Sequence, residues 1–133
     1  MNFIFKINPL GSLLAILANM ILGALWYSVL FGKAWMKAMG YKKEDLSGQN
    51  KAMLLAIVTA VIYALALNFI VANIGVDTIF KAVILAVIVW VGFIVPYALL
   101  GVAYEQRKMK VFLISTGYQG AGLVIMSILI VMV

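Results

Sequence analysis

Apolar residues gather in four long stretches along this chain of 133 residues, and each stretch is about as long as a bilayer is thick. A spanning helix needs about 20 predominantly apolar residues to cross about 30 Å of hydrocarbon. Only helices or closed barrels satisfy their backbone polar groups there, and the stretches lack the alternation of a barrel strand. The pattern therefore predicts an all-α integral membrane protein, with four transmembrane helices in one domain of residues 1–133. The expected spans are about 9–31, 53–74, 79–104 and 112–133.

The connections between these stretches predict how the helices are arranged. Residues 75–78 and 105–110 are short links, and short links force neighbouring helices to run antiparallel. Asn8 and Pro9 form a good helix start, because asparagine caps the first turn and proline fits its first position. The long connection of residues 32–52 carries lysines beside apolar residues, with Trp35 among them, which predicts a short interfacial helix that stops at Gly40.

The distribution of charge predicts an orientation in the membrane. The mean hydropathy is +1.19, and the net charge is +6. Eight of the ten basic residues fall in the first and third connections, which leaves Lys6 and Lys81 on the other side. Loops rich in lysine and arginine stay cytoplasmic, so we expect a multi-pass plasma-membrane protein with both termini extracytoplasmic. Basic loops beside anionic headgroups are ordinary, so the charge indicates no nucleic-acid partner.

Small residues mark the helix faces that can pack closely, because the hydrophobic effect does not join helices in hydrocarbon. In the second span, Ala56, Ala60, Ala64 and Asn68 follow one another at four-residue spacing. This strip fits packing within one bundle or between copies, and we expect the protein to form a homo-oligomer. Pro96 removes one backbone hydrogen bond from the third span and is expected to kink it.

The residue types present argue against catalysis. The chain contains no cysteine and no histidine, so thiolate chemistry and the commonest general base are missing. The four acidic residues lie in loops or at span ends and do not form a metal-binding spacing: Glu44, Asp45, Asp77 and Glu105. We therefore expect no metal and no cofactor. The sequence disfavours a pore, because a pore needs polar residues along a whole helix face. It also disfavours a proton-coupled carrier, because such a carrier needs a titratable group near the midplane of the membrane.

One concentration of polar and aromatic side chains remains in the cytoplasmic half of the spans. Its members are Trp26, Tyr27, Tyr97, Tyr118 and Gln119. A buried glutamine needs hydrogen-bond partners in a bilayer, and the tyrosine hydroxyls can supply them. Two interpretations stay open. These residues form a neutral aromatic pocket for a lipid or a flat amphipathic molecule, or they form an aromatic belt that joins the helices.

With these residues in view, the chain resembles a family of bacterial membrane proteins catalogued as domain of unknown function 1761. The similarity covers essentially the whole chain and is carried by residues 23–28, 31–40, 44–46, 112–114 and 117–118. In the family, Trp-Tyr-Ser is usually followed by proline and the Gly-Tyr of the last helix by histidine, whereas this chain has Val29 and Gln119. The resemblance implies a four-helix membrane protein and no particular activity.

The sequence thus favours a small, non-enzymatic membrane protein whose partners are membrane lipid, its own copies or another membrane protein. The alternative is a membrane enzyme or carrier that binds a hydrophobic small molecule in the aromatic pocket of the cytoplasmic half. A ligand ordered between the first, third and fourth spans would distinguish the two.

Overall fold

The computed structural model describes residues 2–42 and 50–133, and every regular element in this part of the chain is a helix. Four helical stretches are long and apolar enough to cross a membrane, which confirms the predicted all-α membrane fold. They are Pro9–Leu30, Asn50–Ile74, Ile79–Tyr104 and Met109–Met132. The second and fourth begin three residues before the predicted boundaries, because Lys51 and Lys110 are helical and can extend their charged ends towards water.

Two of the four stretches change helix type along their length. The first consists of α1 followed by a π-helical turn η1, and the third consists of α4, a π-helical turn η3 and α5. The turn η3 lies immediately before Val95 and Pro96, and the kink that the sequence predicts at Pro96 stays a prediction. The bounds are α1 Pro9–Leu25, η1 Trp26–Leu30, α2 Gly32–Met39, α3 Asn50–Ile74, α4 Ile79–Val89, η3 Trp90–Ile94, α5 Val95–Tyr104 and α6 Met109–Met132.

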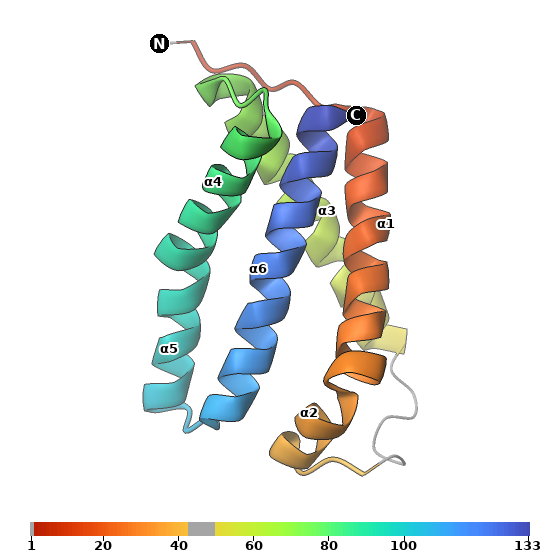
Figure 1. The fold of residues 1–133 in the computed structure, drawn as a ribbon, viewed down its shortest axis with the longest axis vertical. Coiled ribbons are helices and arrows are strands. Elements are labelled where there is room, and N and C mark those ends of the chain that lie inside the picture. The colour runs from red at the N-terminus through yellow and green to blue at the C-terminus, as the bar shows by residue number, and fades with distance from the viewer. Residues whose placement is uncertain (1, 43–49) are drawn as a thin grey trace.

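The last helix, α6, is the centre of the bundle. In Figure 1 it stands between α1 and the continuous stretch of α4 and α5, with α3 behind. It contacts all of these helices and also α2. In the most apolar part of each stretch, 44% of the α6 residues are buried, against 11–22% in the other three. Every other helix is thus held in place mainly by what it meets on α6 or on α1.

The two ends of the bundle differ in charge. Both termini and the link between α3 and α4 lie at one end, and α2 and the link between α5 and α6 lie at the other (Figure 1). The first end, here called the terminal end, carries Lys6 and Lys81. The other, here called the basic end, carries Lys33, Lys37, Lys42, Lys51, Arg107, Lys108 and Lys110. Lys43, which the charge count also includes, and the family residues 44–46 lie outside the described residues.

Local signals at the helix ends act as expected. The Asn8 side chain accepts a hydrogen bond from the Gly11 N–H at 3.0 Å, with Pro9 at the first helical position of α1. Gly40 ends α2 with a φ of 74°, a left-handed conformation that glycine adopts without strain. An eight-residue helix therefore occupies the long connection, and its place at a membrane surface stays a prediction.

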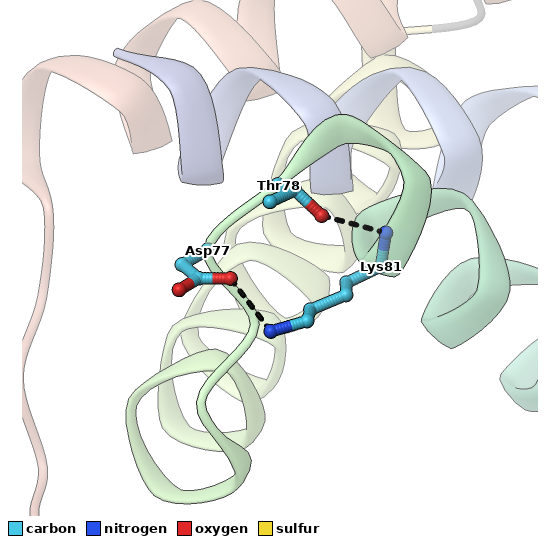
Figure 2. Close-up of polar contacts among 3 residues, drawn as sticks. All are labelled: Asp77, Thr78 and Lys81. Atoms are coloured by element: carbon cyan, nitrogen blue, oxygen red, sulfur yellow. Dashed lines mark hydrogen bonds and ion pairs between the residues drawn. The ribbon is translucent and has the colours of Figure 1, made fainter.

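The start of α4 is fixed by a cap and an ion pair, which Figure 2 shows. The Thr78 hydroxyl accepts the backbone N–H of Lys81 at 3.2 Å, and the Lys81 ammonium lies 2.9 Å from the Asp77 carboxylate. The hydrogen bond from Lys81, together with its positive charge, lowers the pKa of Asp77 below its ordinary value. Both side chains are exposed, so the ion pair itself stabilises the turn only weakly.

The N-terminal segment before α1 is attached to α3 across the terminal end. The Asn73 side chain accepts the Ile4 N–H at 2.8 Å and donates to the Ile4 carbonyl at 2.6 Å. The Asn68 amide oxygen accepts the Asn8 N–H at 2.8 Å, and the Asn68 nitrogen donates to the Ser12 hydroxyl at 2.7 Å. Asn68 is buried, so these bonds satisfy a polar group that would be costly alone in hydrocarbon.

The small-residue strip of the second span packs inside the bundle over most of its length. Ala60, Ala64 and Asn68 are buried, and α3 meets α1 along this face. Ala56, one turn towards the basic end, is exposed together with every residue from Asn50 to Thr59. The strip therefore holds α3 on the bundle only from Ala60 onwards, and residues 50–59 of α3 are exposed in the part of the chain that the structure describes.

Candidate functional site

Two tryptophans bind α6 from opposite neighbours. The Trp26 indole N–H donates to the Ile114 carbonyl at 2.9 Å, and the Trp90 indole N–H donates to the Thr116 carbonyl at 2.7 Å. Each tryptophan is the first residue of a π-helical turn, η1 or η3. A helix carbonyl has two lone pairs and can accept such a bond besides its helical one. Both indole donors are thereby satisfied within the spans, where water is absent.

Glycines on α6 make room for these two indoles. A Cβ atom on Gly117 would lie 3.1 Å from Cζ2 of Trp26, and one on Gly120 would lie 2.8 Å from Cε2 of Trp90. A 2.8 Å approach is shorter than real carbon contacts, so Gly120 cannot carry a side chain unless the Trp90 ring shifts. Gly117 and Gly120 are therefore packing positions for specific rings.

Aromatic rings connect α6 with α2. The rings of Tyr118, Tyr27, Trp35 and Tyr41 follow one another in this order, and each contacts the next edge to face. The distances between successive ring centres are 5.5, 5.3 and 5.4 Å. Such pairs add attraction beyond the area they bury. The Tyr118 hydroxyl donates to the Asn19 carbonyl at 3.1 Å, and the Tyr27 hydroxyl pairs with Ser115. The short helix α2 is thus joined to the bundle through η1.

The structure brings together three of the five predicted pocket residues. Trp26 and Tyr118 lie 6.4 Å apart between ring centres, and Tyr27 lies against Tyr118. Tyr97 does not join them, because its side chain is 79% exposed on α5. Gln119 is half-buried, and within residues 2–42 and 50–133 its side chain makes no hydrogen bond. The expected bonds from Gln119 to Tyr27 or Tyr97 are therefore not present.

The position of Tyr97 follows from the π-helical turn. In an α-helix, residues seven apart lie on nearly the same face. Without the π-helical turn, Tyr97 would therefore lie two turns after Trp90 on the face towards α6. The turn η3 lies between them and has more residues per turn than an α-helix, which rotates α5 relative to α4. Trp90 consequently faces α6 while Tyr97 faces outwards. The order of polar residues along a span predicts their depth in the membrane, and the rotation at η3 changes which face of the helix they lie on.

A cavity of about 410 Å³ lies at the basic end, beside the aromatic cluster. From α2 it is lined by Trp35 and Ala38, and from the start of α6 by Val111 and Ser115. The link between α5 and α6 contributes Arg107 and Lys108. Trp35 and Ser115 also contact Tyr27, so the cavity lies next to the cluster, and Trp35 is the ring that belongs to both. Its lining is amphipathic and positively charged, whereas the sequence predicts a neutral pocket.

The link that borders the cavity has a defined conformation. The Arg107 Nε lies 2.9 Å from the Glu105 carboxylate, and Gln106 has a φ of 56°, which is uncommon for a residue other than glycine. The backbone N–H groups of Glu105 and Arg107 both donate to the Gly101 carbonyl. Arg107 and Lys108 were visible in the sequence only as orientation signals, because nothing there places α2 opposite them.

A second cavity, of about 390 Å³, lies between the third stretch and α6 and is almost entirely apolar. Val87 and Trp90 line one side, and Gly117, Gly120 and Val124 line the other. Within the described ranges, no three His, Cys, Asp or Glu side chains gather in a way that could hold a metal ion.

Comparison with known proteins gives one match. The model of a family described as "Protein of unknown function (DUF1761)" matches residues 10–131, which covers the four membrane-length stretches except for Pro9 and Met132. No curated protein and no solved structure matches this chain.

Proposed function

The chain belongs to the DUF1761 family of proteins of unknown function, and we propose that it is a non-enzymatic, multi-pass membrane protein that binds a lipid-like amphipathic molecule at its basic end. The observation that carries this proposal is the cavity of about 410 Å³ between α2 and the link from α5 to α6. Ala38 and Val111 suit an apolar part of a ligand, and Arg107 and Lys108 suit a polar part. Volumes of about 300–1,000 Å³ are usual for small-molecule sites.

The chemistry of the lining supports binding rather than catalysis. Ser115 contributes a hydroxyl to the cavity wall, and the described residues that line the cavity include no carboxylate or imidazole that could remove its proton. Its side chain pairs with Tyr27 instead. The arrangement can hold and orient a molecule through packing and hydrogen bonds. Among the described lining residues, no group of this kind supports the alternative of a membrane enzyme or carrier.

Filling the cavity tests this proposal. Ala38→Leu adds bulk to the α2 wall and is expected to lower the fraction of protein that retains lipid several-fold, as measured by native mass spectrometry in detergent. Ala34→Leu, one turn earlier on α2, lies outside the lining and is the matched control. Both variants should keep the helix content of the unaltered protein by circular dichroism. Equal lipid retention in both variants would contradict the proposal.

We further propose that the basic end faces the cytoplasm of the cell and that both termini lie outside the plasma membrane. Seven described basic residues at one end against two at the other support this orientation, since basic loops remain cytoplasmic. The chain has no cysteine, so single cysteines can report it. A membrane-impermeant thiol reagent added to intact cells is expected to label Lys6→Cys and not Lys110→Cys. Labelling of position 110 alone would reverse the assignment.

Self-association is a second candidate property, and α3 favours it. Its residues from Asn50 to Thr59 are all exposed, although the same helix is packed against α1 further on. Ala56 continues the small-residue strip into this free half. Small residues let helix backbones approach closely in a membrane, so a second copy could pack here.

A further inference from the structure

We propose that the cavity at the basic end selects an anionic phospholipid through its phosphate headgroup, an inference that rests on the lipid-binding function proposed above. Two consecutive basic side chains, Arg107 and Lys108, line it on the side of the α5–α6 link. At this depth, where the spans end, lipid phosphates are the abundant anions. A headgroup carrying a net negative charge therefore matches the cavity in both charge and position.

The Glu105 carboxylate is paired with Arg107 and balances only one of the two positive charges. Glu105 lies 2.9 Å from Nε of Arg107, but it is not part of the cavity lining. A guanidinium has five N–H donors, and only the Nε donor is engaged by Glu105 within the described chain. Arg107 can therefore bind Glu105 and a phosphate oxygen together, with Lys108 as a second cation. Arginine forms two parallel hydrogen bonds with phosphate, which adds geometric specificity.

Trp35 supplies a neutral donor on the opposite wall. The indole N–H groups of Trp26 and Trp90 donate to α6 carbonyls at 2.9 and 2.7 Å. In the part of the chain that the structure describes, the Trp35 indole N–H has no such partner, although its ring lines the cavity. Tryptophan side chains prefer the headgroup level of a bilayer. Trp35 is therefore a neutral lining residue whose indole N–H is not bound to any described residue and is available as a donor to a headgroup.

The same geometry disfavours a zwitterionic lipid. The ammonium group of a phosphatidylcholine headgroup would lie near the two cations and repel them, while its phosphate gains the same contacts. A phosphatidylglycerol headgroup has the phosphate without the ammonium. The expected difference in the dissociation constants of the two lipids is on the order of tenfold. Two basic residues near an anionic group together strengthen its binding by about this factor.

The test uses the full chain in detergent, titrated with dioleoyl phosphatidylglycerol and, separately, with dioleoyl phosphatidylcholine, and read by native mass spectrometry. The unaltered protein is expected to bind the anionic lipid about tenfold more tightly. Arg107→Gln with Lys108→Gln should remove this preference, because phosphatidylglycerol binding falls more than phosphatidylcholine binding. Lys110→Gln, an exposed basic residue outside the lining, is the matched control and should keep the preference. Lys108→Gln alone, expected to lower the preference partly, replaces the double variant if that variant does not fold.

Several outcomes overturn the inference. Loss of the preference in Lys110→Gln to the same extent as in the double variant would indicate a general basic surface. Displacement of bound phosphatidylglycerol by excess sodium phosphate would indicate a site for free phosphate instead of lipid. Equal binding of the two lipids, with both reduced by Ala38→Leu, would refute the headgroup selectivity and leave the proposed lipid-binding function standing. Binding of both lipids that is insensitive to Ala38→Leu would refute the proposed function itself.

Discussion

Replacing Ala64 by leucine is expected to detach α3 from α1 and to lower the free energy of unfolding by about 1–3 kcal/mol. Ala64 is fully buried on the face of α3 that meets α1. Its carbonyl accepts a hydrogen bond from the Asn68 side chain at 2.7 Å, and the same nitrogen donates to Ser12 on α1. Three added carbon atoms would separate the helices at the point where close packing and these hydrogen bonds hold them. Thermal unfolding in detergent, followed by circular dichroism, measures the effect.

Ala56→Leu is the matched control for this substitution. Ala56 belongs to the same strip and the same helix, two turns before Ala64, but it is exposed. Its leucine variant should unfold at the temperature of the unaltered protein. If a second copy packs on this half of α3, Ala56→Leu should also lower the dimer fraction measured by light scattering without destabilising the monomer. Equal unfolding temperatures for both variants would show that the strip does not hold the bundle together, and an unchanged dimer fraction would place any interface elsewhere.

Replacing Gly120 by alanine is expected to have the second large effect, a destabilisation of about 1–3 kcal/mol. The new Cβ would lie 2.8–3.0 Å from three atoms of the Trp90 ring. The ring cannot easily move away, because its N–H is bound to the Thr116 carbonyl at 2.7 Å. Either the hydrogen bond breaks or η3 moves off α6. The expected readouts are a lower unfolding temperature and a shifted tryptophan emission maximum.

Gly92→Ala provides the comparison for Gly120→Ala. Gly92 lies in the turn η3 itself, and a Cβ placed on it has no neighbouring atom within 4 Å. This variant gains the same methyl group without a clash, so its unfolding temperature and emission should stay close to those of the unaltered protein. A destabilisation of Gly92→Ala as large as that of Gly120→Ala would mean that glycine matters here for helix conformation and not for the fit of Trp90.

The positions of the spans and of several helix ends could be predicted from the sequence because they depend on local chemistry. A run of about 20 apolar residues is long enough to cross hydrocarbon whichever helix it later meets. Asn8 caps α1 through its own side chain, and Gly40 ends α2 by its left-handed conformation. The separation of basic residues between two ends likewise follows from the order of spans and links.

The aromatic cluster could be predicted only in part. Depth along a span placed Trp26, Tyr27 and Tyr118 at one level, and the structure brings them together. The depth of a residue does not say which way its side chain points. The sequence therefore predicts Tyr97 in the same group, whereas in the structure Tyr97 faces outwards. Trp90, which does face α6, was not included because the rotation at η3 has no clear signal in the sequence.

The sequence by itself determined the number of spans, their approximate limits, the charge difference between the two ends and the absence of histidine and cysteine chemistry. Only the tertiary structure decided that α6 is the central helix, that Gly120 fits Trp90, and that α2 closes a cavity opposite Arg107 and Lys108. The physical reason is that lipid is as apolar as a helix interface, so hydropathy does not distinguish the face that packs from the face that meets lipid. That distinction depends on the shapes and hydrogen bonds of particular side chains, which come together only in the folded chain.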